Sequence, residues 1–228
     1  MKSVKVIGVG GIGTALLPFL CRYLNFEGEK ARVFLVDGDE FEKKNASRQS
    51  FKQIGNKARV KVRELASDFE HVSFRVIGEF VTPKNIGVVI KEGDIVFLCV
   101  DNHKTRKLVS DYCEKLNDIT LISGGNELTD GNVQVYVKKS GLELSAPLAK
   151  FHPEIEAPGD KNPGEMSCGE RSRIPSSRQI IVTNMVAASW MFAALWLIEQ
   201  NNLDSIGELY FDIVQGRTQR IQRKGRKQ

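Results

Sequence analysis

Residues 3–17, "SVKVIGVGGIGTALL", combine an apolar strand, a glycine-rich turn and the first turns of a helix. In the turn, Gly8, Gly10 and Gly13 follow the spacing Gly-x-Gly-x-x-Gly. Gly8 permits a tight turn, Gly10 lets the backbone approach a phosphate, and Gly13 lets the helix pack against the strand. The first turn of the helix offers unpaired N–H groups to an anion. Taken alone, the motif suits NAD, FAD or ATP.

Beyond this stretch, apolar strands alternate with helical segments. The alternation predicts an α/β fold, with a Rossmann-like, doubly wound and mostly parallel sheet. Later segments predict a half-exposed strand, a long irregular Pro/Gly-rich loop, an apolar helix and a β-hairpin, so the C-terminal strands should be antiparallel. Expected strands cover 3–9, 31–37, 72–80, 94–101, 119–125 and 131–139; expected helices cover about 12–24, from Lys57 onward, 103–117 and 180–198; the loop covers 145–178 and the hairpin 208–222.

The bulk composition limits the classes of protein that fit. The formal net charge is +5, yet the last twelve residues hold six Lys/Arg and no acid, so the body of the chain is nearly neutral and nucleic-acid binding is not expected. The four cysteines form no Cys-x-x-Cys pair, which removes the usual framework of a zinc site. We expect Cys21, Cys99 and Cys113 to be buried thiols in a reducing, cytoplasmic compartment.

The segment 180–198 has nineteen uncharged residues, long enough to cross a membrane. Because it contains Thr183, Asn184 and Ser189 and lies between parts of one predicted fold, we interpret it as a buried core helix. We therefore expect a single domain over residues 1–222 and a short basic tail over 223–228, with no membrane association.

An acidic residue ends the second predicted strand. Asp37 follows Gly13 by 24 residues, which in a doubly wound fold places its carboxylate beside ribose hydroxyls. An acid at this position disfavours a 2′-phosphate, so a nucleotide with a free ribose is expected. Both an oxidoreductase and an ATP-using enzyme remain compatible with this observation.

The rest of "DGDEFEKKNASRQSF", residues 37–51, favours ATP. Arg48 can clamp phosphate oxygens with paired hydrogen bonds, and Asn45 can orient it, whereas a dehydrogenase has no use for either residue here. Lys57 begins a predicted helix, where its ammonium could meet the β- and γ-phosphates. Asp101 ends the fourth predicted strand, at the edge where such sheets bind ligands, and a hard carboxylate there suits Mg²⁺.

These motifs together resemble the ThiF/MoeB/HesA superfamily, the adenylyltransferase relatives of ubiquitin-activating enzymes. The shared features are the glycine loop, the Asp-x-Asp…Asn-x-x-Arg-Gln run, a Gly-x-Lys element, and Val-Asp-Asn followed by Arg106. The resemblance covers most of residues 1–222 and implies one adenylation domain that uses ATP and Mg²⁺. It implies a nucleotide site made of Gly8, Gly10, Gly11, Gly13, Asp37, Asp39, Asn45, Arg48, Gln49, Lys57, Asp101 and Asn102, with Asp101 as the metal ligand.

The resemblance also implies a reaction. Members adenylate the C-terminal carboxylate of a small ubiquitin-like or sulfur-carrier protein, or of a peptide, and many are homodimers. In many relatives a cysteine in the loop corresponding to residues 145–178 then accepts the activated protein, and Cys168 beside Arg171 and Arg173 is the candidate here.

The sequence departs from the family in its zinc motifs and at its start. It lacks the paired Cys-x-x-Cys motifs, and it begins almost at the first strand, so the arginine that in many relatives reaches a partner's ATP has no counterpart before the glycine loop. We therefore expect a minimal bacterial-type member. A non-catalytic ThiF-type subunit and a NAD-dependent oxidoreductase remain the alternatives.

Overall fold

The computed structural model describes residues 1–27, 29–166, 170, 179–202 and 207–224. Its centre is a nine-stranded sheet in the order β11-β10-β8-β7-β6-β1-β2-β5, with β9 paired to β8. The parallel strands are β1 (Lys2–Ile7), β2 (Ala31–Val36), β5 (Val72–Ile77), β6 (Ile95–Leu98) and β7 (Ile119–Asn126). The antiparallel strands are β8 (Asp130–Lys139), β9 (Leu142–Glu143), β10 (Glu208–Asp212) and β11 (Arg217–Ile221), and a separate small sheet pairs β3 (Glu40–Phe41) with β4 (Gly55–Asn56).

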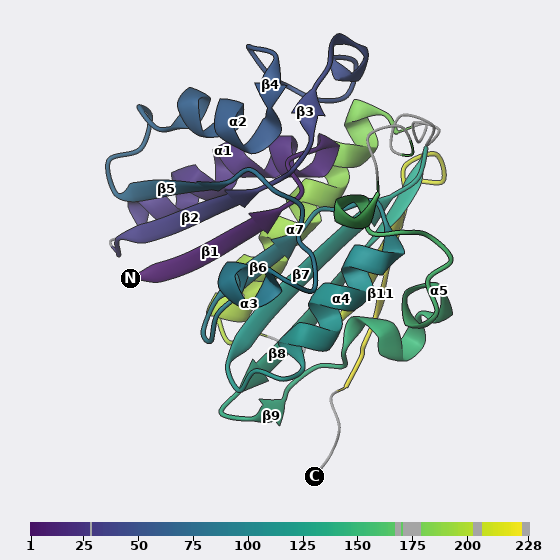
Figure 1. Ribbon diagram of the computed structural model, residues 1–228. Coiled ribbons are helices and arrows are strands. Elements are labelled where there is room, and N and C mark those ends of the chain that lie inside the picture. The colour runs from purple at the N-terminus through teal and green to yellow at the C-terminus, as the bar shows by residue number, and fades with distance from the viewer. Residues whose placement is uncertain (28, 167–169, 171–178, 203–206, 225–228) are drawn as a thin grey trace.

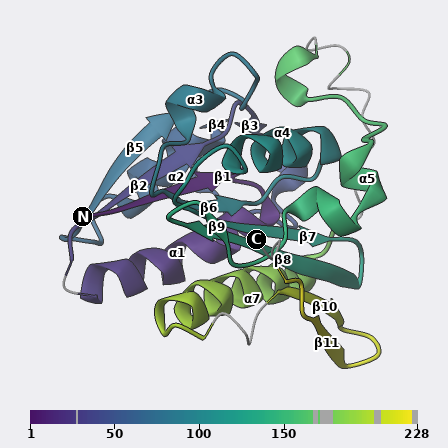
Figure 2. The same ribbon diagram turned by 90° about the horizontal axis from the view of Figure 1, so that it is seen from below.

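Helices cover both faces of the sheet, as a doubly wound fold requires (Figures 1 and 2). Each face has its own cluster of buried apolar side chains. One face carries α1 (Gly11–Phe26), α2 (Lys57–Leu65) and α7 (Ile181–Glu199); the other carries α3 (Ile86–Val89), α4 (His103–Cys113), the 3-10 turn η2 (Leu148–Phe151) and α5 (Pro153–Glu156). The predicted α/β fold with a mostly parallel sheet is therefore confirmed.

The strand order places a topological switch point beside β1. This strand pairs with β2 on one side and with β6 on the other, and all three run parallel. Connections that leave neighbouring strands in opposite directions open a crevice at the carboxyl ends of those strands. The glycine loop after β1 and the Asp101 segment after β6 both lie at this edge.

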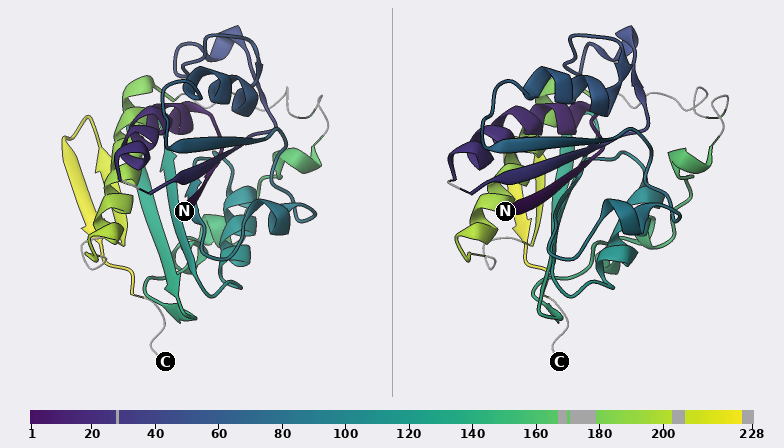
Figure 3. Two further views of the ribbon diagram at one scale, coloured as in Figure 1. Left: turned by 90° about the vertical axis from the view of Figure 1, so that its left-hand side faces the viewer. Right: turned by 60° about the vertical axis from the view of Figure 1, so that its left-hand side comes forward.

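The predicted half-exposure of residues 131–139 is wrong at the centre of β8. Val133, Val135 and Val137 are buried against the α1/α7 face, while Tyr136 is buried on the opposite face. The reason is tertiary: β10 and β11 extend the sheet beyond β8, so this strand is internal (Figure 3), and α7 covers one of its faces while η2 packs on the other.

Helix α7 is only partly the buried core helix that its composition predicts. One side packs on α1, β7 and β8, but Ile181, Val182, Met185 and Trp196 are each about half exposed, at 50, 50, 53 and 49%. In the described part of the chain it is the one helix long and apolar enough to cross a membrane, and 44% of its apolar window is buried within the fold.

The loop predicted to be irregular contains short helical turns. Its described part forms η2, α5 and a 3-10 turn η3 (Pro163–Glu165). Proline lies at or next to the start of each of these turns, where its fixed φ is compatible with them. The predicted C-terminal hairpin is confirmed: β10 and β11 pair antiparallel around a turn in which Gly216 has a φ of +60°.

Candidate active site

The glycine loop has the geometry that its spacing predicts. Gly8 has a φ of +90°, and a Cβ added there would lie 2.7 Å from the carbonyl oxygen of Cys99. A Cβ on Gly13 would lie 2.2 Å from the carbonyl oxygen of Gly8, so the helix packs directly on the end of the strand. Among the described residues, a Cβ added to Gly10 would meet only Gln49 Nε2 within 4 Å, at 3.8 Å. Gly10 is therefore the glycine with space for an incoming group.

Asp37 fastens this loop to the neighbouring strand. Its Oδ2 accepts the N–H of Val9 at 2.7 Å, and its Oδ1 accepts the N–H of Asp39 at 2.8 Å. Burial raises the pKa of the Asp37 carboxyl, although the charge of Lys57 and the two backbone N–H groups act in the opposite direction. Asp37 thus holds the loop in place, and contact with a ribose remains a prediction.

Lys57 is the first residue of α2, as predicted, and it lies next to Asp39. Its ammonium is 2.5 Å from Asp39 Oδ2; the lysine side chain is buried, whereas that of Asp39 is half exposed. Asn56 supports both loops, because its Oδ1 caps α2 by accepting from Arg59 N–H and its Nδ2 donates to the Asp37 carbonyl at 2.8 Å. Asn56 is not among the residues predicted from the sequence, although an Asn immediately before a helix is a recognisable cap signal.

The segment before Gln49 is a compact turn built on Asn45. The Asn45 side chain accepts the Glu42 N–H at 3.2 Å, and its carbonyl accepts the N–H groups of Arg48 at 3.0 Å and Gln49 at 2.9 Å. The turn, including the 3-10 helix η1 (Lys43–Asn45), therefore fixes the backbone from which Arg48 projects. Within the described chain, no hydrogen bond or ion pair occupies the partly buried Arg48 guanidinium.

Two amides at the glycine loop have unpaired oxygens. Gln49 Oε1 and Asn184 Oδ1 are buried without a hydrogen-bond partner in the described structure, and Asn184 Nδ2 lies 3.5 Å from the Arg48 carbonyl. Asn184 comes from the first turn of α7, so the structure adds to the site a residue whose polarity, in the sequence, indicated only that this helix does not cross a membrane.

Beyond β6, Asp101 is exposed and Asn102 caps α4 by accepting the Thr105 N–H at 2.8 Å. Arg106 supports this turn from within: it is 5% exposed and donates to the carbonyls of Val100 at 2.6 Å and Gly124 at 2.7 Å. Burial lowers the pKa of the Arg106 guanidinium, and the negative charge of Asp101 counteracts that effect.

The loop after β9 crosses this same edge. Asp160 accepts the N–H groups of His103 at 2.6 Å and Lys104 at 2.9 Å, at the N-terminus of α4. The buried Asn162 donates to the carbonyl of Val81 at 2.8 Å. Sequence patterns carried no signal for either contact, because the partners are far apart along the chain. Cys168, predicted to be a nucleophile, lies outside the described residues, as do Arg171 and Arg173.

The other cysteines behave as predicted. Cys21, Cys99 and Cys113 are buried, and burial raises the thiol pKa of Cys21 and of Cys99 to about 12. No group of three or more His, Cys, Asp or Glu side chains that could hold a metal occurs among the described residues. A lone carboxylate such as Asp101 fits a magnesium ion delivered with nucleotide phosphates, since Mg²⁺ usually takes one or two protein carboxylates and keeps waters.

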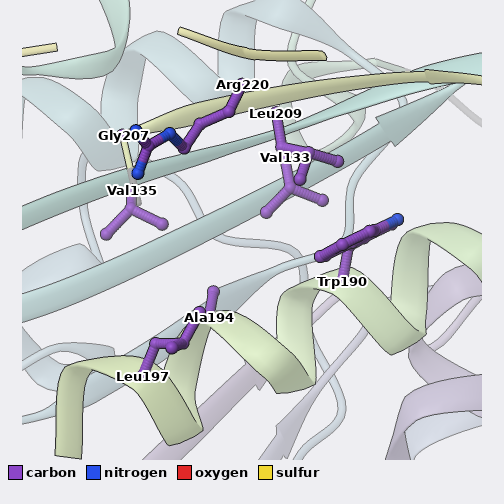
Figure 4. A pocket seen from close by; sticks show the side chains of 8 residues that line it. All are labelled: Val133, Val135, Trp190, Ala194, Leu197, Gly207, Leu209 and Arg220. Atoms are coloured by element: carbon purple, nitrogen blue, oxygen red, sulfur yellow. The ribbon is translucent and has the colours of Figure 1, made fainter. Parts of the chain in front are cut away.

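A separate apolar pocket lies away from this edge, between α7 and strands β8 and β10 (Figure 4). Its side chains are mostly hydrocarbon, and the polar side-chain atoms belong to Arg220 and to the Trp190 indole. The lining residues are Val133, Val135, Trp190, Ala194, Leu197, Gly207, Leu209 and Arg220. The pocket lacks the polar groups that orient a nucleotide, so it is not the candidate active site.

Comparison with known proteins agrees with the fold and the motifs. A stretch of 146 residues is 33% identical to the adenylyltransferase and sulfurtransferase MOCS3 of Drosophila sechellia, and covers 59% of this chain and 29% of the relative. A MOCS3-1 protein of Zea mays is 32% identical over 139 residues, covering 59% and 28%. These curated relatives are thus matched over less than a third of their length.

Solved structures resemble the whole fold at lower identity. Escherichia coli MccB with ATP superposes with a TM-score of 0.72 at 19% identity, covering 98% of this chain and 64% of that chain. PaaA superposes with a TM-score of 0.72 at 15% identity, covering 99% and 65%. The family model described as the ThiF family matches residues 1–226. With the glycine loop, the Asn45–Gln49 turn and Asp101 gathered at the switch point, the chain belongs to the ThiF family.

Proposed function

We propose that this chain is an ATP-dependent adenylyltransferase that activates the C-terminal carboxylate of a small ubiquitin-like or sulfur-carrier protein, or of a peptide. The observation that carries the proposal is that the segments bearing the glycine loop, Arg48, Lys57 and Asp101 all follow strands or turns at the carboxyl edge of the sheet, where Gln49 lies beside Gly10 and Lys57 pairs with Asp39. This is the set of groups that a triphosphate with its metal ion requires.

In the proposed reaction, a carboxylate oxygen of the acceptor attacks the α-phosphorus of ATP. A new O–P bond forms, the bond from the α-phosphorus to its bridging oxygen breaks, and pyrophosphate leaves with that electron pair. The products are an acyl-adenylate and pyrophosphate. Negative charge grows on the phosphate oxygens in the transition state, so Arg48 and Lys57 accelerate the step by stabilising that charge.

The other residues position the nucleotide. The first turn of α1 offers N–H groups to a phosphate, Gly10 leaves space for it, and the Asp37–Val9 contact holds the loop. Lone pairs on Asp37 that the two backbone N–H groups leave free would accept a ribose hydroxyl. Asp101, next to Asn102, would hold Mg²⁺, which when bound neutralises phosphate charge.

Two further parts of the proposal extend beyond this site. We propose Cys168 as the residue that could accept the activated acyl group. We also propose a homodimer that buries the exposed apolar side of α7, since Ile181, Met185 and Trp196 lie along one face of that helix. Analytical ultracentrifugation tests the second point: Met185→Glu should shift a dimer to monomers, and a wild-type protein that sediments as a monomer would rule it out.

The test of the nucleotide site is thermal melting with and without Mg·ATP, compared with Mg·NAD⁺. Mg·ATP should raise the melting temperature of wild type, and NAD⁺ should not. Arg48→Ala should lose the increase with Mg·ATP, while its melting temperature without ligand stays close to that of wild type. Lys52→Ala is the matched control, because it removes an exposed cation four residues away. Stabilisation by NAD⁺ in place of ATP would favour the oxidoreductase alternative.

Catalysis itself requires a second measurement. Exchange of labelled pyrophosphate into ATP, in the presence of peptides with a free C-terminal carboxylate, should occur with wild type and stop with Asp101→Ala. ATP-dependent stabilisation without exchange, across carrier proteins ending in Gly-Gly and across other peptides, would identify a non-catalytic ATP-binding subunit instead.

A further inference from the structure

Asn184 occupies a position with no evident reason for a polar side chain. It lies in the first turn of α7, a helix without a charged residue until Glu199, and it is 0% exposed. Its Oδ1 has no hydrogen-bond partner in the described structure. An unsatisfied buried amide is costly, and an apolar side chain would fill the space more cheaply. The amide therefore requires an explanation in what it touches.

What it touches is the nucleotide loop. A Cβ added to Gly11 would lie 2.2 Å from Asn184 Nδ2 and 2.7 Å from its Oδ1, so the amide lies flat against the first residue of α1. Figure 2 shows α1 and α7 side by side beneath the sheet, and the two helices are in contact. Gly11 is thus a glycine because Asn184 occupies the space that a side chain would need.

The same amide also reaches the Arg-Gln turn. Asn184 Nδ2 lies 3.5 Å from the carbonyl oxygen of Arg48, at the long end of a hydrogen bond. The next residue, Gln49, faces Gly10 and has a buried, unpaired Oε1 of its own. One side chain of α7 therefore contacts both the loop that would receive a phosphate and the backbone that carries the arginine.

We infer that Asn184 is a positioning residue for phosphate binding, which seats the Arg48 backbone on the glycine loop. In this arrangement the Arg48 guanidinium and the N-terminus of α1 are held toward the same anion. The inference rests on the proposed nucleotide function and adds to it a residue from a third segment of the chain. A misplacement of the cation by a fraction of an ångström weakens a charge-assisted contact to phosphate.

The first test measures the dissociation constant of Mg·ATP by calorimetry, together with the melting temperature of the unliganded protein. Asn184→Ala should weaken Mg·ATP binding between about tenfold and about a hundredfold. Thr183→Val is the matched control: Thr183 is equally buried on the same turn, but its hydroxyl donates to the Leu128 carbonyl, away from the loop. The control should lower the melting temperature by roughly 2–4 °C and leave Mg·ATP binding unchanged.

A double-mutant cycle separates positioning from a general loss of stability. If Asn184 acts through Arg48, the pair Arg48→Ala and Asn184→Ala should bind Mg·ATP no more weakly than Arg48→Ala alone. Additive losses, or wild-type affinity in Asn184→Ala, would overturn the inference while leaving the proposed function intact. If Asn184→Ala does not fold, Asn184→Ser replaces it in the same cycle.

A second cycle needs no nucleotide. Gly11→Ala should strongly lower the melting temperature of wild type, and the loss should be smaller when Asn184→Ala has made room for the new methyl group. Equal losses in both backgrounds would show that Asn184 does not seat on the loop. If wild type fails to bind Mg·ATP at all, the proposed function and the positioning role both fail, and this cycle still decides whether the contact exists.

Discussion

The Lys57 ammonium lies 2.5 Å from Oδ2 of Asp39, so a buried cation at the start of α2 is bound to a half-exposed acid that follows β2. The acid holds the ammonium at the edge of the sheet where the glycine loop ends. In the proposed site the ammonium divides its three N–H groups between Asp39 and a phosphate oxygen.

This pairing predicts effects of different size for its two members. Lys57→Met should weaken Mg·ATP binding at least about tenfold, because a charged hydrogen bond contributes roughly 1.5–3 kcal/mol. Asp39→Asn should weaken binding less than Lys57→Met does, because the amide oxygen can still accept a hydrogen bond from the ammonium and hold it in place. Lys5→Met is the control, since Lys5 also forms a buried ion pair, with Asp94 at 3.5 Å, away from the carboxyl edge. Wild-type affinity in Lys57→Met, measured by calorimetry, would contradict a phosphate role.

The glycines of the loop should differ in what their substitution damages. Gly10→Ala should lower the free energy of unfolding less than Gly13→Ala does, because the new methyl group at Gly10 has open space. The methyl group should nevertheless weaken Mg·ATP binding by blocking the approach of a phosphate. Gly13→Ala should lower the free energy of unfolding by about 1–3 kcal/mol or more, since its Cβ meets the Gly8 carbonyl. Urea denaturation and calorimetry on both variants check this contrast, and equal stability would refute it.

Asp160 should hold the crossing loop on α4. Asp160→Ala removes the acceptor of the His103 and Lys104 N–H groups, so these two amides should exchange hydrogen faster and the free energy of unfolding should fall by about 0.5–2 kcal/mol. Asp111→Ala is the control, because it removes an acid from the last turn of the same helix. Unchanged exchange of His103 and Lys104 in Asp160→Ala would show that the contact is absent in solution.

Glu208 should make stability depend on pH. Burial opposes its ionisation, but hydrogen bonds from His152, Tyr210 and Arg223 outweigh burial and lower the Glu208 pKa to about 2, against an ordinary 4.5. The ionised form therefore contributes stability in full above pH 4.5, and that contribution is lost as the pH falls from 4.5 toward 2. Urea denaturation at pH 5.5 should show Glu208→Gln less stable by roughly 3 kcal/mol, and the difference should shrink through this window.

His152 should make the stability of the protein fall at high pH, as Glu208 makes it fall at low pH. Its hydrogen bond to Glu208 raises the His152 pKa above 6.5, with burial acting against it and Glu154 in favour. A raised pKa means that the stabilisation is complete below pH 6.5 and is lost as the pH rises through the folded-state value. His152→Gln should remove this decline. The measurement is the free energy of unfolding of wild type and of His152→Gln between pH 6 and 9. If the two proteins show the same dependence on pH, the raised His152 pKa is contradicted.

Local patterns in the sequence determined the site's individual parts. The spacing of Gly8, Gly10 and Gly13 predicted a turn that only glycine can make. Asp37 was predicted at the end of the second strand and lies directly after β2, while its contact with a ribose stays a prediction. Lys57 was predicted at a helix start and lies there. These features depend on backbone conformation within a few residues, which the side chains themselves impose.

Only the tertiary structure decided how these parts meet. Asp160 reaches His103 across 57 positions, and Asn184 reaches Arg48 across 136. The burial of β8 likewise depends on α7, which comes much later in the chain and covers one face of the strand. Such contacts depend on which helix packs on which face of the sheet. The periodicity of apolar residues in the sequence shows only that one face of a helix or strand is apolar, and not which element packs against it. The residues proposed to bind a phosphate were therefore predicted from the sequence, whereas the long-range contacts of Asp160 and Asn184 were not.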